Sequence, residues 1–251
     1  MKILYSIMIV MLLSVNVYAD ESIVTLSTGE WAPYTSEYLL DGGICSEIVK
    51  AAFDHAGIET ALEFYPWTRA IKMMERGRVT ASYPWVKRSD IQEYALYSSE
   101  LHVQVYSFFY YKKFFPKGLI DDSVEDLKKY RIGVGKGYFY AEQLNAMGFH
   151  TIPVTSTSNG MLMLLRGHID LMTEDSVVGK YLISTLLPGR DGDFGEVQAP
   201  LESESVYLLF SKKKEGVAQL VESFNKGLKK IKENGGYNRI FVKYGLYLQE
   251  H

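Results

Sequence analysis

The sequence contains a single cysteine, Cys45, so no disulfide can form within the chain. Cys45 stands on an apolar helical pattern, which predicts a small core residue in preference to a reactive thiol. Histidine is also scarce, because five are scattered over 251 residues and no two have the spacing of a metal-binding pair. We therefore expect neither a metal nor any other cofactor.

Membrane-length apolar runs are missing as well. The run from Ile3 to Val15 is shorter than the roughly 18 residues that span a bilayer. It follows a basic residue and precedes Val17-Tyr18-Ala19, which places small residues where a signal peptidase cuts. We predict a signal peptide over residues 1–19 and an exported, periplasmic protein; the alternative is a membrane anchor.

A basic excess is absent too. The chain has 27 Lys and Arg against 30 Asp and Glu, a net charge of −3 that becomes −4 without residues 1–19. This balance argues against binding to nucleic acid or to an anionic membrane surface. The segment GVGKGY lacks the spacing of a phosphate-binding loop, and no Ser-His-Asp or Cys-His arrangement is evident. The sequence thus indicates a protein that is not an enzyme.

What the sequence does contain is a repeated α/β pattern. Strand, helix and strand alternate with short loops up to VTASYPW, and the alternation starts again at YRIGVG. Two long aromatic segments, at 101–113 and 204–213, separate the two blocks and predict strands that cross between two lobes. We predict lobe 1 over 20–107 and 206–251 and lobe 2 over 108–205. Each lobe is expected to be a mainly parallel sheet with helices on both faces.

Four segments, WAPY, GGICSEIVKAAF, GVGKGYFYAEQL and GHIDLMTEDSVVGKYL, resemble the periplasmic solute-binding proteins of family 3, the amino-acid ABC-transporter type. The resemblance extends over nearly the whole chain after residue 19. It implies a type II two-lobed fold with two hinge strands, which closes as a monomer on a small molecule. The implied partner is an inner-membrane ABC permease or a sensor. The alternatives are a ligand-binding module of a sensor and a dehydratase-like enzyme on the same fold, with Glu174 beside Asp175 as its acid.

The tripeptide Tyr-Pro-Trp occurs twice and points to the site. In a parallel α/β sheet, ligands bind beyond the carboxyl ends of the strands. Trp67 and Trp85 stand at the predicted ends of the second and third strands, and Tyr34 follows the first. We expect these three rings to provide stacking surface in the cleft. For Trp67, packing against the core is an equally weighted alternative.

Charged partners for a ligand are predicted on both lobes. Arg69 lies in the first turn after Trp67 and is expected to hold an anionic group, unless it pairs with Glu63 or Glu93 on the surface. Asp175 matches, by the resemblance, the residue that receives the ammonium group of an amino acid. Its alternative role is to cap the helix that follows.

The chain departs from the family pattern at two positions. The arginine that holds the ligand carboxylate in the family falls on Ile91, with Arg88 one helical turn earlier. The usual threonine of lobe 2 is replaced by Tyr138, which is expected to bring a ring or a hydroxyl to the site. We therefore predict a zwitterion or another amine-bearing polar molecule, not an amino acid in the usual pose.

Overall fold

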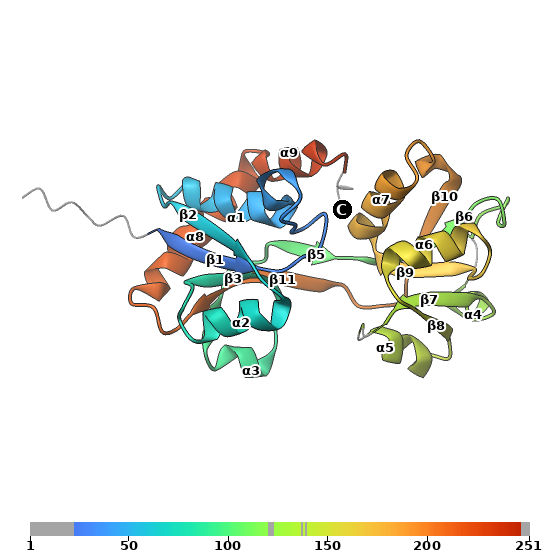
Figure 1. The fold of residues 1–251 in the computed structure, drawn as a ribbon, viewed down its shortest axis with the longest axis horizontal. Helices are drawn as coiled ribbons and strands as arrows, with labels where there is room; N and C mark the ends of the chain where they lie inside the picture. The colour runs from blue at the N-terminus through green and yellow to red at the C-terminus, as the bar shows by residue number, and fades with distance from the viewer. Residues whose placement is uncertain (1–22, 120–122, 137, 139, 247–251) are drawn as a thin grey trace, which may run out of the picture.

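The chain forms two α/β lobes joined by crossing strands (Figure 1). The computed structural model describes residues 23–119, 123–136, 138 and 140–246. The predicted signal peptide and Gly137 lie outside the described residues.

The first sheet has the strand order β2-β1-β3-β11-β4, with β5 also paired to β11. Its strands are β1 (Val24–Thr28), β2 (Thr60–Phe64), β3 (Ala81–Val86), β4 (Ala95–Tyr97), β5 (His102–Gln104) and β11 (Glu204–Ser211). β1, β2 and β3 are parallel, and β11 runs antiparallel to β3, β4 and β5. The carboxyl ends of the three parallel strands therefore lie at one edge of this lobe.

The second sheet repeats this arrangement in the order β10-β6-β9-β7-β8. Its strands are β6 (Tyr106–Tyr111), β7 (Arg131–Gly135), β8 (His150–Val154), β9 (Leu171–Asp175) and β10 (Phe194–Gln198). β7, β8 and β9 are parallel, whereas β6 and β10 are antiparallel to their neighbours. Asp175 is thus the last residue of a parallel strand in lobe 2.

The chain changes sheet at Val105, between β5 and β6, and returns between β10 and β11. Residues 106–107, assigned to lobe 1 in the prediction, pair with β9 in the second sheet. Residues 204–205, assigned to lobe 2, pair with β5 in the first. The segment 101–113 contains two strands with a break at Val105, so the chain leaves the first sheet there and not at the predicted boundary after residue 107.

Helices cover both faces of each sheet (Figure 1). In lobe 1 they are η1 (Leu40–Gly42), α1 (Ile44–Asp54), α2 (Trp67–Glu75), α3 (Ser89–Gln92), α8 (Val217–Glu233) and α9 (Gly236–Lys243). In lobe 2 they are α4 (Val124–Leu127), α5 (Tyr140–Ala146), α6 (Thr157–Leu165), α7 (Ser176–Leu186) and η2 (Asp191–Asp193). This layered arrangement confirms the predicted fold class.

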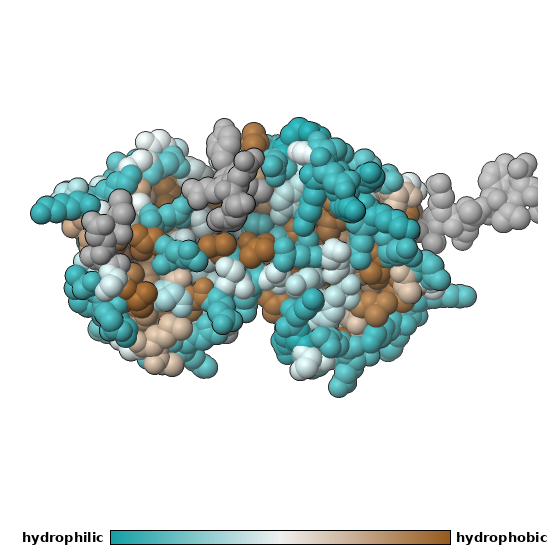
Figure 2. All heavy atoms as spheres, turned by 180° about the vertical axis from the view of Figure 1, so that it is seen from behind, coloured by the Kyte–Doolittle hydropathy of each residue, from teal (hydrophilic) through white to brown (hydrophobic). Residues whose placement is uncertain are grey.

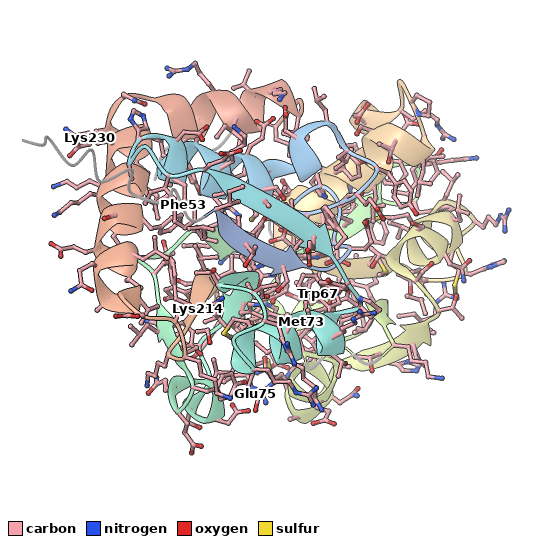
Figure 3. The ribbon with its side chains drawn as sticks, turned by 60° about the vertical axis from the view of Figure 1, so that its left-hand side comes forward. Phe53, Trp67, Met73, Glu75, Lys214 and Lys230 are labelled. Atoms are coloured by element: carbon pink, nitrogen blue, oxygen red, sulfur yellow. The ribbon has the colours of Figure 1, made fainter. Side chains whose placement is uncertain are left out.

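Alternation along β11 shows how the sequence builds these layers. Val206, Leu208 and Phe210 pack under α1 and α8, whereas Leu209 packs on the opposite face with α2. Phe53 of α1 closes the larger core, with its ring 4.9 Å from that of Phe224 (Figure 3). Cys45 lies in the same core with no exposed surface, which confirms its predicted role as a small core residue.

Candidate ligand-binding site between the lobes

The two lobes meet around a notch that Figure 2 shows in the space-filling view. The end of β9 faces lobe 1, because Asp175 accepts a hydrogen bond from Tyr34 in the loop after β1. α7 extends from this point, and its Val178 belongs to the core cluster of lobe 1. The predicted site residues can be placed relative to this junction.

The two tryptophans of the repeated Tyr-Pro-Trp tripeptide come together. Trp67 begins α2, on the side of lobe 1 that faces lobe 2 (Figure 3), and its ring stands edge-to-face against Trp85 at 5.2 Å between centroids. The indole lies so close over Gly29 that a Cβ there would be 2.6 Å from it. Both rings are half-buried, so this pair packs against the lobe and still presents indole surface.

Trp85 is the second-to-last residue of β3, which ends at Val86, one residue beyond the predicted end. β3 pairs with β1 only at Ala81 and Ser82, and beyond them it pairs with β11. Pro84 can occupy a strand there because it stands where the ladder to β1 has ended. The indole of Trp85 donates to the hydroxyl of Ser82 at 2.9 Å, which fixes its orientation.

Tyr34 does not provide stacking surface, because its ring has an exposed fraction of 0%. It contributes its hydroxyl, which donates to Asp175 Oδ1 at 2.9 Å and lies 2.7 Å from His102 Nε2. The half-buried Trp31 packs against Tyr34 with 4.5 Å between the ring centroids and an angle of 44° between the ring planes. The expectation that the ring of Tyr34 offers stacking surface is thus corrected, because no pattern in the segment WAPY distinguishes the buried ring from its half-buried neighbour.

Asp175 is 1% exposed and divides its two oxygens between different roles. Oδ1 accepts from Tyr34 and from the N–H groups of Val177 and Val178 at 3.0 Å, so it caps α7. Oδ2 is fully buried and has no hydrogen-bond partner among the described residues. Burial raises the pKa of Asp175 to about 6, although these hydrogen bonds, and the N–H of Val105 nearby, favour the charged form.

Glu174 is a second buried carboxyl beside Asp175, with 2% of its surface exposed. It accepts the hydroxyl of Thr157 at 2.6 Å and the backbone N–H of Asp175 at 2.9 Å. Burial raises its pKa to about 7, and the neighbouring charge of Asp175 acts in the same direction. Neither carboxyl forms an ion pair within the part of the chain that the structure describes.

Tyrosines surround this acidic pair on the lobe 2 side. The rings of Tyr138 and Tyr106 stand 5.1 and 5.0 Å from that of Tyr140. Tyr138 is 38% exposed, and its ring covers Gly135, where any side chain would overlap with it. Burial raises the pKa of Tyr138 to about 12. Tyr138 therefore brings a neutral ring and hydroxyl to this side of the junction.

The basic candidates of lobe 1 lie on its surface. Arg69 is exposed, and its guanidinium stacks over Tyr65 at 4.6 Å without an ion pair to Glu63 or to any other described acid. Arg88 is tied to Asp90 by two hydrogen bonds of 3.1 and 2.8 Å. Position 91 is occupied by an isoleucine that is 3% exposed in the core below α2. No buried cation therefore meets the carboxylates in the described residues.

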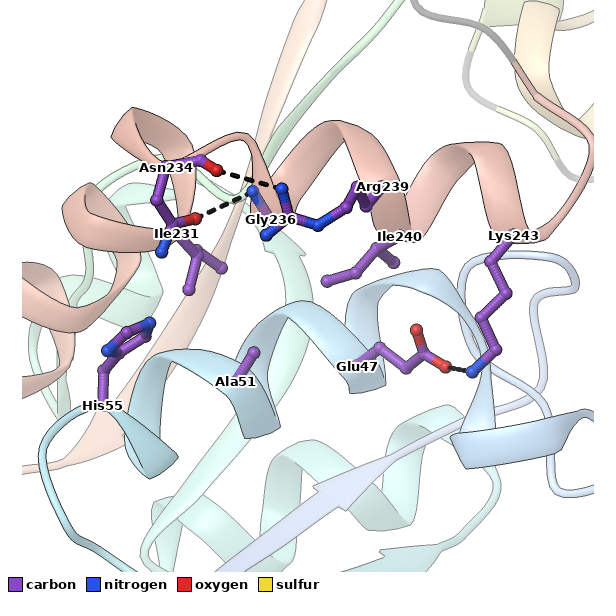
Figure 4. Close-up of a pocket in the computed structure, with 9 residues that line it drawn as sticks. All are labelled: Glu47, Ala51, His55, Ile231, Asn234, Gly236, Arg239, Ile240 and Lys243. Carbon is purple, nitrogen blue, oxygen red and sulfur yellow. Dashed lines mark hydrogen bonds and ion pairs between the residues drawn. The ribbon is translucent and has the colours of Figure 1, made fainter.

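A second hollow lies on lobe 1, between α1 and α9 (Figure 4), with a volume of about 360 Å³. Its charged groups already have partners: Lys243 pairs with Glu47 and Asp41, and Arg239 donates to the carbonyl of Asn234 at 3.0 Å. Within the described residues, Lys243 and Arg239 are thus both held by contacts inside lobe 1.

In residues 23–119, 123–136, 138 and 140–246, no three His, Cys, Asp or Glu side chains come together as a metal site would require. No helix in those ranges has the length and apolar character needed to cross a membrane.

Comparison with known proteins supports the fold. No protein-family model matches the chain, and no match was found among the curated proteins. Among solved structures, substrate-binding domain 2 of GlnP from Lactococcus lactis matches with a TM-score of 0.69 and 20% identity, over 91% of this chain and 96% of that chain. The arginine-, lysine-, histidine-binding protein ArtJ from Geobacillus stearothermophilus matches with a TM-score of 0.62 and 18% identity, over 90% and 97%.

A histidine kinase sensor domain with similarity to periplasmic binding proteins matches with a TM-score of 0.65 and 16% identity, over 91% of this chain and 98% of that chain. Together these structures confirm the predicted two-lobed binding-protein fold over nearly the whole chain. At such identities they show the fold alone, and the identity of the ligand depends on the residues of this chain.

Proposed function

We propose that this protein binds a small amine-bearing solute between its lobes and presents it to a membrane partner, as a solute-binding protein does. The observation that carries the proposal is the buried Oδ2 of Asp175, which has no partner among the described residues. A buried carboxylate oxygen without a hydrogen bond is unfavourable, so the site favours a ligand that donates one. An ammonium or guanidinium group supplies both the proton and the charge.

In this proposal each residue contacts a different part of the ligand. Asp175 holds the cationic group, and Tyr34 fixes the orientation of Asp175 through Oδ1. Trp67 and Trp85 provide surface on lobe 1, and Tyr138 does so on lobe 2. Arg69, the exposed basic group at the start of α2, is the residue that meets an anionic group if the ligand carries one.

The setting follows from the predicted signal peptide and from the two crossing strands. The protein would act in the periplasm as a monomer and close by a hinge at the changes of sheet. An ABC-type permease is the proposed partner. The sensor module is the second candidate, favoured by the match to a histidine kinase sensor domain. Pull-down of a permease or of a kinase from native membranes separates the two.

A thermal-shift assay on residues 20–251 tests the binding proposal. At a hundredfold excess over its Kd, a ligand adds about 2.7 kcal/mol to the free energy of unfolding. In a protein of this size that raises the Tm by roughly 5–10 °C. We expect such a rise with amines or amino acids, and its loss in Asp175→Asn.

Asp191→Asn, an exposed aspartate of the same lobe, is the matched control and keeps the full shift. A shift that survives Asp175→Asn would contradict the assigned role of Asp175. No shift with any amine would contradict the proposed function, and turnover of the ligand would favour the enzyme alternative.

A further inference from the structure

The junction between the lobes has more buried negative charge than its own residues balance. Glu174 and Asp175 are adjacent and almost fully buried, and neither has an ion-pair partner in the described ranges. Glu204, which accepts a hydrogen bond from Tyr106 at 3.5 Å, adds a third carboxyl near them. Burying carboxylates without a cation is costly, so the charge balance favours a ligand that carries net positive charge.

His102, a basic side chain that reaches this cluster through Tyr34, is neutral. Burial and the charge of Lys232 lower the pKa of His102 to about 4. Tyr34 donates its single proton to Asp175, and the tautomer of His102 that carries Nε2–H would complete this chain by donating to the oxygen of Tyr34. This chain of hydrogen bonds satisfies Oδ1 and brings neither a charge nor a donor to Oδ2.

The cations that would hold a ligand carboxylate are also committed elsewhere or exposed. Arg88 is paired with Asp90, and Arg69 stacks over Tyr65 at the surface. An exposed, solvated guanidinium contributes little to binding an anion. A ligand carboxylate brought to the buried acids would add a like charge to them. An amino acid would therefore gain binding free energy from its ammonium group and lose binding free energy through its carboxylate.

The edge of lobe 1 suits the remainder of such a molecule. Trp67 and Trp85 present indole surface there, and Trp31 lies half-buried against Tyr34. Indole faces bind apolar groups and also attract cations. The charge is thus recognised by lobe 2 and the carbon skeleton by lobe 1.

We propose that the ligand is an organic cation, an amine or guanidinium compound that lacks a carboxylate next to its amino group. Glu174 and Asp175 together balance its charge, and Asp175 Oδ2 accepts its proton in a hydrogen bond. This inference rests on the proposed binding function and narrows it from amine-bearing solutes in general to those with net positive charge.

The test compares compounds that differ only in the carboxylate. Kd values for residues 20–251 are measured by titration calorimetry with agmatine and arginine, putrescine and ornithine, and phenethylamine and phenylalanine. We compare the two members of the pair that contains the tightest-binding compound. There we expect the amine to bind at least about tenfold more tightly than the amino acid that carries the additional carboxylate, which corresponds to about 1.4 kcal/mol. An amino acid that binds as tightly as its amine would overturn the inference and leave the binding function standing. If all six compounds fail to bind, the proposed function is refuted together with the inference.

Variants give an independent readout on the best-binding amine. Glu174→Gln keeps the shape of the side chain and is expected to weaken binding by about tenfold, because it removes one of the two balancing charges. Asp191→Asn, an exposed aspartate of the same lobe, is the matched control and is expected to leave the Kd within about twofold, because an exposed charge is screened. An unchanged Kd in Glu174→Gln would overturn the inference by showing that this carboxyl does not balance the charge of the ligand.

Discussion

The acidic pair predicts a measurable dependence of stability on pH in the ligand-free protein. Burial raises the pKa of Glu174 from 4.5 to about 7, so the folded protein keeps this proton at pH values where the unfolded chain has lost it. Stability from a raised carboxyl pKa is fully present below the unfolded value and is lost as the pH rises through the folded value. The free energy of unfolding should therefore fall between pH 5 and pH 8, and Glu174→Gln should remove the part of that fall that Glu174 contributes.

The magnitude follows from the same pKa values. A carboxyl that titrates at 4.5 when unfolded and at about 7 when folded loses roughly 2–3 kcal/mol of stabilisation between pH 5 and pH 8. Asp175, whose pKa is raised from 3.8 to about 6, acts in the same direction at lower pH. Glu204, with a raised pKa, adds to the same trend, whereas four tyrosines whose pKa values are raised remain protonated throughout: Tyr34, Tyr106, Tyr138 and Tyr140.

His102 acts in the opposite direction, so the comparison must be made between proteins. Its lowered pKa means that its contribution to stability grows as the pH rises from about 4 to 6.5. This contribution is present in both wild type and Glu174→Gln, and it cancels in the difference between them. Contributions of surface groups to stability are also common to both proteins and cancel in the same difference.

Urea unfolding of both proteins at pH 5, 6, 7 and 8 provides the assay. Relative to wild type, Glu174→Gln is expected to gain roughly 2–3 kcal/mol between the two ends of the range. Glu142→Gln, on the exposed side of α5, is the matched control and should run parallel to wild type. Parallel curves for Glu174→Gln would refute the argument that burial of this carboxyl governs its titration.

Three further predictions follow from individual contacts. Tyr34→Phe removes the hydroxyl donor of Asp175 Oδ1 and should lower the free energy of unfolding, measured in urea, by roughly 1–3 kcal/mol. An unchanged free energy of unfolding would contradict the hydrogen bond between Tyr34 and Asp175. In Gly227→Ala the new Cβ would overlap with the carbonyl of Ala52, so the Tm should fall by several degrees for a cost of roughly 1–3 kcal/mol, whereas Gly192→Ala, in open space, should keep it. Affinity for an amine should rise between pH 5 and pH 8 in calorimetric titrations, because the ligand favours ionised carboxyls; a flat profile would contradict this.

The fold could be predicted because its signals are local. The alternation of apolar residues in strands and the helical spacing around Cys45 appear directly in the sequence. The break at Val105 could not be predicted, because nothing in the aromatic run 101–113 shows where one sheet ends and the next begins. That break is decided by which strand β5 and β6 pair with, β11 in one case and β9 in the other.

The site was predicted less completely, for a physical reason. Position 91 could be recognised as an apolar residue in place of a cation, and the structure buries it in the core. Exposure of a particular ring depends on packing between distant segments, so the sequence could not show that Tyr34 is buried. His102 was missed for the same reason: a single histidine has no spacing pattern, and its role depends on Tyr34, 68 residues away in the chain.

The two roles weighed for Asp175, helix cap and ligand contact, do not compete, because a carboxylate has two oxygens. Capping α7 and accepting from Tyr34 both use Oδ1. The hydroxyl of Tyr34 and the N–H groups of Val177 and Val178 hold the side chain of Asp175 in one orientation. In this orientation Oδ2 is buried and has no partner among the described residues. A carboxylate positioned in this way loses little conformational freedom when a ligand donates to it, so more of the interaction energy is retained in binding. The cap would therefore support the proposed contact of Asp175 with a cation, and its hydrogen bonds help to stabilise a buried acid at the end of β9.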